Sequence, residues 1–199
     1  MLNGLSKTEL NRLDELFDLS EDKEMLLAIW IIGRPAAGKT TAATLLCEEL
    51  KRRAYRVELV DGDVVRSAFD GLLGYSAANR LKAFMRYVNI SQLMQSRGII
   101  PVVATIGGYQ HFREIVRSEI TNPRFIYLDC PFEVAAQRDQ KGLYAKALAG
   151  EIKDFFDVDI PFESPTRVDL RIDTSSRKPQ EVVARIMNHF EQGQLFLER

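Results

Sequence analysis

The chain has 199 residues, 46% of them hydrophobic and 28% charged, a balance that fits one globular domain with or without an appendage and excludes a disordered chain. With 27 Lys and Arg against 28 Asp and Glu the net charge is −1, so no broad positive field draws the chain to nucleic acid or to an anionic membrane. The two cysteines, Cys47 and Cys130, lie far apart in apolar segments, which indicates reduced thiols and a cytoplasmic protein.

The first 24 residues predict an amphipathic helix that is separate from the rest of the chain. Apolar side chains recur in it at roughly helical spacing, at Leu5, Leu10, Leu13, Leu16 and Phe17. Acidic residues stand where a signal peptide has its apolar core, so we expect no secretion. The longest strongly apolar run, residues 25–33, is well short of the ~20 residues of a membrane span. We therefore divide the chain into an N-terminal helical appendage, residues 1–24, and one domain, residues 25–199.

The domain alternates apolar, strand-like runs with segments of helical periodicity. We expect strands at residues 27–32, 55–60, 99–105, 124–129 and 168–172. Helices are expected at residues 39–53, 77–97, 110–120, 131–138 and 178–191. In the second of these helices the side chains expected to face the core are Leu81, Phe84, Met85, Val88 and Leu93.

This alternation predicts an α/β fold, a doubly wound and mostly parallel sheet with helices on both faces. The run at residues 99–105 is apolar almost throughout, as in a strand buried on both faces of a parallel sheet. Ligands of such folds bind beyond the carboxyl ends of the strands, so the loops that follow the predicted strands are the place to look for a site.

Residues 33–40 form a phosphate-binding pattern between the first predicted strand and the first predicted helix. They read Gly33-Arg34-Pro35-Ala36-Ala37-Gly38-Lys39-Thr40, which satisfies the G-x-x-x-x-G-K-[ST] pattern of P-loop NTPases. The glycines let backbone N–H groups wrap the phosphates, Lys39 reaches the β and γ oxygens, and Thr40 offers its hydroxyl to Mg²⁺. With Thr41, these residues predict a site for a nucleoside triphosphate, ATP by frequency.

The second predicted strand ends in Asp61-Gly62-Asp63, with Arg66 one helical turn further on. A carboxylate beside the γ-phosphate accepts the proton of an attacking hydroxyl or holds Mg²⁺ through water, and an arginine binds an anionic acceptor. We assign Asp61, with Thr40, to the metal. The same spacing is equally typical of a polar turn with a helix-capping Asp.

From about residue 31 to residue 174 the chain resembles the adenylylsulfate kinases. The most specific stretch is residues 138–147, RDQKGLYAKA, followed by AGEI at residues 149–152, which matches RD-x-KGLYKKA-x-AGEI of that family. PFESP at residues 161–165 resembles PYEAP, residues 61–66 match DGD-x-x-R, and Gly74-Tyr75-Ser76 with Arg80 resembles GFS-x-x-DR. These kinases transfer the γ-phosphate of ATP to the ribose 3′-hydroxyl of adenosine 5′-phosphosulfate (APS).

The resemblance implies roles for individual residues in the transfer. Asp63 matches the acceptor-side base, Lys141 adds a charge near the transferring group beside Lys39, and Arg66 and Arg80 match the clamps on the phosphosulfate. Positioned cations and Mg²⁺ neutralise the charge that spreads over the transferring phosphoryl group, so little covalent catalysis is needed.

The resemblance also implies how the two nucleotides are held. Arg138 matches the residue that lies over the ATP adenine, and the acceptor base is expected between Tyr75 and Phe155, which by themselves could be ordinary core or loop aromatics. Further acceptor contacts are expected at Ile106, Gly107 and Leu143. Members of the family are commonly dimeric, so a homodimer is expected, with residues 1–24 as a contact.

Departures from the family pattern gather on the acceptor side. Asn79 stands where the family has Asp, and Ala83 where it has a substrate-contacting Asn. The family's FISPYR reads TIGGYQ at residues 105–110, so Gly107 replaces its Ser, Gly108 follows, and Gln110 replaces its Arg.

Two further segments differ. The family's FTGID reads FFDVD at residues 155–159, and the P-loop residues 34–37 read RPAA in place of LSGA.

These departures have consequences for the reaction. Gly107 excludes a phosphoserine intermediate, which direct in-line transfer does not need. Each hydrogen bond lost to a charged ligand group costs ~1.5–3 kcal/mol, enough for two losses to change acceptor preference by orders of magnitude.

Three functions stay open at this point. The first is an APS kinase, and the second is a related kinase retargeted to another nucleotide acceptor, such as cytidine diphosphoramidate. The third is an inactive nucleotide-binding regulatory protein, which loss of Lys39, Thr40 or Asp63 would mark, although all three are present. His111 and His189 are too separated to suggest a metal cluster, so ATP and Mg²⁺ are the expected ligands.

Overall fold

The structure is a computed structural model that describes residues 27–70 and 76–193. The predicted N-terminal helix and Tyr75 lie outside these residues. None of the described helices is both long and apolar enough to cross a membrane.

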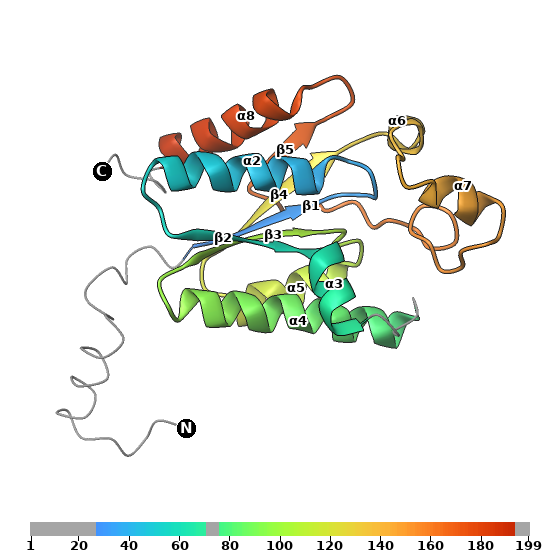
Figure 1. Ribbon diagram of the computed structural model, residues 1–199, viewed down its shortest axis with the longest axis horizontal. Helices are drawn as coiled ribbons and strands as arrows, with labels where there is room; N and C mark the ends of the chain where they lie inside the picture. The colour runs from blue at the N-terminus through green and yellow to red at the C-terminus, as the bar shows by residue number, and fades with distance from the viewer. Residues whose placement is uncertain (1–26, 71–75, 194–199) are drawn as a thin grey trace, which may run out of the picture.

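A five-stranded parallel sheet forms the middle layer of the described part of the chain (Figure 1). Its strands are β1 (Ala28–Ile32), β2 (Val57–Asp61), β3 (Ile100–Thr105), β4 (Pro123–Asp129) and β5 (Leu170–Asp173). Their order is β2-β3-β1-β4-β5, and every neighbouring pair is parallel. All carboxyl ends therefore meet at one edge of the sheet, the edge near which α6 and α7 lie in Figure 1.

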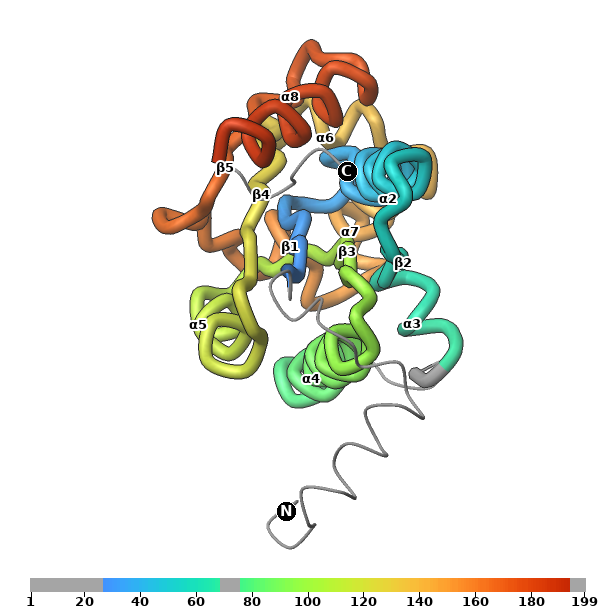
Figure 2. The backbone as a smooth tube through the Cα atoms, turned by 90° about the vertical axis from the view of Figure 1, so that its left-hand side faces the viewer, coloured from blue at the N-terminus to red at the C-terminus, as the bar shows by residue number. Residues whose placement is uncertain are grey.

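Helices cover both faces of the sheet. The helices α2 (Lys39–Arg52) and α8 (Pro179–Gln192) pack on one face, and α4 (Ala77–Gln95) and α5 (Gln110–Glu119) on the other (Figures 1 and 2). The short helices α3 (Gly62–Asp70), α6 (Phe132–Gln137) and α7 (Leu143–Leu148) follow β2 and β4. This is the doubly wound arrangement that the alternation of elements predicts.

The strand β1 shows why the sheet needs both helical layers. All of its residues are buried, and successive side chains point to opposite faces. Ile29 and Ile31 join the hydrophobic cluster beneath α2 and α8, whereas Trp30 and Ile32 join the cluster beneath α4 and α5. A sheet with one open face would leave one of these sets in water.

The predicted strands and helices are confirmed, with bounds that differ by at most two residues. Two short helices, α3 and α7, have no counterpart among the predicted elements. Both are single segments beside the carboxyl edge of the sheet, and α7 at six residues is too short to show a helical apolar stripe.

The predicted core face of α4 is wrong in part. Phe84 and Val88 are buried, but Leu81 and Leu93 are 38% and 57% exposed. Ser91 and Gln95 take buried positions instead, because the Ser91 hydroxyl donates to Tyr87 O at 2.7 Å and the Gln95 amide donates to Thr121 O at 2.8 Å. Polar side chains with partners are tolerated in a core, and here they turn the buried stripe away from Leu93.

We expect Phe84→Ala to lower the free energy of unfolding by about 3–5 kcal/mol. The Phe84 ring is 3% exposed, and its centroid lies 4.4 Å from that of Phe112 and 5.6 Å from that of Trp30. Leu93→Ala on the same helix is the control, and we expect it to change the free energy by no more than about 0.5 kcal/mol. Urea unfolding measures both, and equal losses would contradict the observed face of α4.

Candidate functional site

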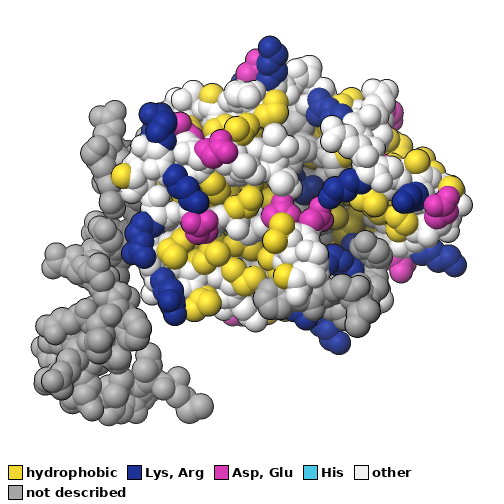
Figure 3. Space-filling view, viewed as in Figure 1, with side chains coloured by type: hydrophobic (Ala, Val, Ile, Leu, Met, Phe, Trp, Pro, Cys, Tyr) yellow, Lys and Arg dark blue, Asp and Glu magenta, His cyan; other side chains and the backbone are white. Residues whose placement is uncertain are grey.

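A cavity of about 460 Å³ opens at the carboxyl edge of the sheet. It brings together most of the predicted site residues: Pro35, Ala36, Gly38, Lys39, Thr40, Thr41, Asp61, Asp63, Arg66, Arg80, Ile106, Gly107, Arg138, Lys141, Leu143 and Phe155. Gly33, Arg34 and Ala37 do not line it. In Figure 3, basic and acidic side chains lie side by side near the middle of the visible face, on the side of α6 and α7.

The P-loop connects β1 to α2. Because α2 begins at Lys39, its first backbone N–H groups lack intrahelical partners and face the loop, as phosphate binding requires. The Lys39 ammonium donates to Arg34 O at 2.7 Å. Removal of this ammonium from water lowers the pKa of Lys39 to about 8, an effect opposed by the carboxylates of Asp63 and Asp61. Phosphate oxygens would favour the charged form further.

Thr40 and Asp61 lie in contact at the end of β2. The Thr40 hydroxyl donates to Asp61 Oδ2 at 2.6 Å, and Asp61 Oδ1 accepts from the backbone N–H of Asp63 at 2.8 Å. Asp61 thus caps α3 with one oxygen and meets the P-loop with the other, so the helix-capping alternative describes Asp61 rather than Asp63. A hydroxyl and a carboxylate in contact are hard oxygen donors of the kind Mg²⁺ takes, so these residues fit the metal predicted here.

Asp63 and Lys141 meet across the mouth of the cavity. Lys141 Nζ donates to Asp63 Oδ2 at 2.6 Å, and this bond raises the pKa of Lys141. The two side chains are 74% and 65% exposed, and exposed pairs of this kind add little to stability. The pair joins α3 to the loop before α7 and presents a carboxylate and an ammonium to the cavity.

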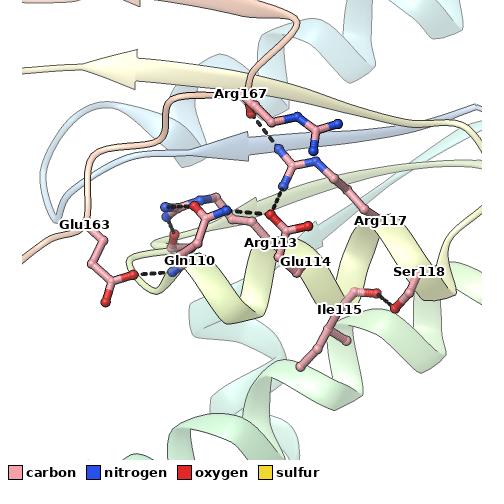
Figure 4. A network of polar contacts seen from close by, with 9 residues as sticks. Gln110, Arg113, Glu114, Ile115, Arg117, Ser118, Glu163 and Arg167 are labelled. Carbon is pink, nitrogen blue, oxygen red and sulfur yellow. Dashed lines mark hydrogen bonds and ion pairs between the residues drawn. The ribbon is translucent and has the colours of Figure 1, made fainter.

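The loop after β3 forms the cavity wall beside the P-loop, because the Gly33 N–H donates to Ile106 O at 3.3 Å. Gly107 has φ +56°, and a Cβ there would lie 2.7 Å from Ile32 Cγ2, so only glycine fits. Arg113 of α5 is 1% exposed and donates to Gly107 O and to Gln110 Oε1, both at 2.7 Å (Figure 4). Burial lowers the pKa of Arg113.

The Gln110 side chain lies against the first turn of α5, its own helix (Figure 4). It does not line the cavity. Its amide donates to Glu114 at 2.5 Å, and its backbone N–H donates to Glu163. Glu163 also ties the loop from its own backbone, because its N–H donates to Gly108 O at 3.0 Å. Gln110, which stands where the family pattern has arginine, therefore acts as a structural amide of this loop.

An aromatic wall closes one side of the cavity, where the acceptor contacts are predicted. Phe155 and Phe156 are 8% and 3% exposed and both line the cavity. The Arg80 guanidinium carbon lies 4.6 Å from the Phe156 ring centroid, and Arg80 donates to Asp154 O. Phe156 was not among the predicted site residues, although its place beside Phe155 was a signal for it.

Sequence reasoning also missed Arg113 and Tyr87. Tyr87 of α4 lines the cavity, and its hydroxyl donates to Gly62 O at 3.2 Å. Burial raises the pKa of this phenol. Nothing in the local sequence separates Tyr87 or Arg113 from other residues of amphipathic helices, so no signal pointed to them.

A second cavity of about 360 Å³ adjoins the P-loop on its other side. Ala37, Thr41 and Arg138 line it, together with Thr174 and Arg177 after β5. The Arg138 guanidinium donates to Ser175 O at 2.7 Å. Arg138 lines both cavities, which gives the predicted adenine-side residue a place next to the phosphate loop.

The family model of adenylylsulphate kinase matches residues 25–173. The chain belongs to this family. It is 37% identical over 161 residues to the adenylyl-sulfate kinase of Deinococcus deserti, covering 81% of this chain and 89% of that one. It is 41% identical over 150 residues to a probable adenylyl-sulfate kinase of Archaeoglobus fulgidus, covering 75% and 97%.

Solved structures agree with this family membership. The Mycobacterium tuberculosis APS kinase CysC, determined in complex with AMPPNP and APS, superimposes with a TM-score of 0.78 at 29% identity, covering 82% of this chain and 96% of that one. Shikimate kinase of Aquifex aeolicus, at 21% identity and a TM-score of 0.56 over 84% of this chain and 98% of its own, shares the fold alone. The predicted P-loop kinase fold is confirmed.

We expect Gly107→Ala to lower the free energy of unfolding by about 2–4 kcal/mol, the sum of a left-handed backbone penalty and overpacking against Ile32. Gly142→Ala is the matched control, because Gly142 has φ +64° but no atom within 4 Å of the added Cβ. Its loss should be only the backbone part, about 1–2 kcal/mol. Thermal or urea unfolding distinguishes the two, and equal losses would remove the role assigned to the Ile32 contact.

Proposed function

We propose that this protein is an APS kinase, which transfers the γ-phosphate of ATP to the ribose 3′-hydroxyl of adenosine 5′-phosphosulfate. The observation that carries the proposal is a single cavity that joins the P-loop to the Asp63–Lys141 pair and to a wall of aromatic and guanidinium groups. The similarity to an APS kinase solved with AMPPNP and APS supports both halves of this assignment.

The nucleotide side has the parts that phosphoryl transfer needs. Lys39 and the backbone of residues 33–40 hold the β- and γ-phosphates, and Arg138 lies over the adenine at the second cavity. The Thr40 hydroxyl and Asp61 Oδ2, which lie 2.6 Å apart, would hold Mg²⁺ directly or through water. When bound, Mg²⁺ neutralises charge that develops on the transferring group. As Lys39 approaches the phosphates, its bond to Arg34 O is exchanged for bonds to phosphate oxygens.

The acceptor side supplies a base and anion clamps. The Asp63 carboxylate accepts the proton of the attacking hydroxyl, and Lys141 holds that carboxylate in place and adds charge near the transferring group. Arg66 and Arg80 bind the phosphosulfate. Phe155 stacks against the acceptor base, and Ile106, Gly107 and Leu143 complete the walls of this subsite.

A retargeted nucleotide kinase is the second candidate, and specific observations favour it. Gln110 is held by Arg113 and Glu114 outside the cavity, Ala83 offers only a methyl group at the cavity wall, and Phe156 occupies the same wall. An acceptor such as cytidine diphosphoramidate fits this class. The inactive regulatory function is disfavoured, because Lys39, Thr40 and Asp63 all line the cavity. A homodimer, a contact role for residues 1–24 and a cytoplasmic location stay predictions.

The deciding experiment is a mass-spectrometric product assay with Mg-ATP and APS, run beside a panel of nucleotides that includes cytidine diphosphoramidate. We expect APS to gain one phosphate at a rate well above every competitor. If APS is inert while another nucleotide is phosphorylated, the second candidate replaces the first. The Lys39→Ala variant is the control and should form no product, and if no acceptor in the panel reacts with the parent protein the kinase proposal fails.

We expect Asp63→Asn to lower kcat by about 10²–10⁴-fold, the usual contribution of a positioned general base. ATP affinity should change little, because Asp63 lies on the acceptor side. Lys39→Ala should instead weaken ATP binding as well as turnover. Steady-state kinetics and calorimetry measure the two effects, and an Asp63→Asn variant as active as its parent would remove Asp63 from the role of base.

A further inference from the structure

Arg34, Tyr144 and Asp157 join the P-loop to the segment that carries the aromatic wall. Arg34 Nη1 lies 3.5 Å from Asp157 Oδ1, and the two side chains are only 16% and 9% exposed. Tyr144 is 1% exposed, and its hydroxyl donates to Pro35 O at 3.2 Å and lies 3.5 Å from Asp157 Oδ2. Two segments far apart in the sequence therefore meet through a largely buried ion pair and a phenol.

The backbone at Asp157 has a conformation that glycine also adopts. Asp157 has φ +72°, a left-handed conformation that is unstrained for glycine and that Asp and Asn adopt more readily than other residues. The family pattern has glycine there and leucine at position 34, so the two departures from the pattern touch each other in space. Burial raises the pKa of Asp157 and Arg34 opposes this effect, so the guanidinium stabilises the charged carboxylate.

The turn around Asp157 couples the position of Asp157 to that of Phe155 and Phe156. The Asp157 N–H donates to Ile160 O at 2.7 Å, and the Phe155 N–H donates to Asp159 Oδ2 at 2.9 Å. These bonds close residues 155–160 into a compact turn, so a shift of Asp157 moves Phe155 and Phe156 with it. Phe156 in turn packs on Gly108, where a Cβ would lie 2.5 Å from Phe156 Cε1.

The other end of the ion pair lies in the P-loop. Arg34 O accepts the Lys39 ammonium at 2.7 Å, while the Arg34 guanidinium pairs with Asp157 and lies 5.5 Å from the centroid of the Phe162 ring. Arg34 therefore contacts the lysine of the P-loop through its backbone and, through its side chain, Asp157 in the turn that carries Phe155 and Phe156. Arg34 itself does not line the main cavity.

We propose that Arg34 and Asp157 are positioning residues for the acceptor: their ion pair, supported by Tyr144, sets the separation between the P-loop and the Phe155–Phe156 wall. The inference rests on the proposed kinase function, because the separation matters only when both substrates bind in one cavity. The backbone of the P-loop holds the phosphates whatever side chain stands at position 34, so the pair acts on the acceptor and not on ATP.

The test compares Arg34→Leu, Asp157→Gly and the double variant by steady-state kinetics with the acceptor that the parent protein phosphorylates. We expect each single variant to lower kcat/KM for the acceptor by about 10- to 100-fold, since small misplacements of bound reactants have effects of this size. KM for ATP should stay within about twofold. The double variant should lose about as much as either single variant, because one substitution already breaks the pair, and recovery to the parental value would show that the pair does not position the acceptor.

Two further variants complete the kinetic test, one as a control and one as a substitute. Lys51→Leu removes an exposed ion pair with Glu58 at 3.0 Å and should change no kinetic constant. If Asp157→Gly does not fold, Asp157→Asn takes its place, because asparagine also removes the charge and tolerates positive φ. Additive losses in the double variant, or equal changes in KM for ATP and for the acceptor, would overturn the proposal.

A readout independent of catalysis separates this proposal from the proposed function. The same four proteins form a double-mutant cycle on the free energy of unfolding, and we expect the effects of the two substitutions to be non-additive. If the parent protein phosphorylates no nucleotide, the proposed function is wrong, and so is the acceptor role of the pair. If the parent is active but the effects of the two substitutions on unfolding and on kinetics are additive, only the role of the ion pair is wrong.

Discussion

The double pairing of β1 is the constraint on which the rest of the structure depends. β1 is hydrogen-bonded to β3 on one side and to β4 on the other, and Ile32 stands opposite both Thr105 and Tyr127. Because β1 and β3 end at the same level, the P-loop and the loop after β3 leave the sheet side by side. The Gly33 N–H donates to Ile106 O at 3.3 Å and extends this pairing past the strands into the cavity wall.

The charges of the site are arranged in pairs that substrates can replace. Lys39 is held by a backbone carbonyl, Asp61 by a threonine hydroxyl and a helix N-terminus, and Lys141 by Asp63. Each partner is of the kind that a phosphate, a metal or a ribose hydroxyl also provides. The folded chain thus holds each of these charged groups in place with a partner of its own.

Local pattern predicts much of this structure and misses what depends on distant contacts. The buried strands follow from apolar runs such as residues 99–105, and the P-loop and the Asp63–Lys141 region follow from residue spacing and family motifs. Leu93 was placed in the core because it is apolar, yet Ser91 and Gln95 are buried with hydrogen-bond partners supplied by the fold. Arg113 has a charge that normally keeps a residue exposed, and its bonds to Gly107 O and Gln110 Oε1 explain its burial. Arg34 and Asp157 lie far apart in the sequence, and no local pattern relates them, so their contact could not be predicted.

The contact between Phe156 and Gly108 bears on how the acceptor wall is built. The family pattern has proline at position 108 and threonine at position 156, and any Cβ at position 108 would lie 2.5 Å from the Phe156 ring. A Cβ at position 108 and the Phe156 ring in its observed place exclude each other, so glycine at position 108 is what leaves room for the ring. The wall therefore depends on both departures together, and proline at position 108 would require the ring to move.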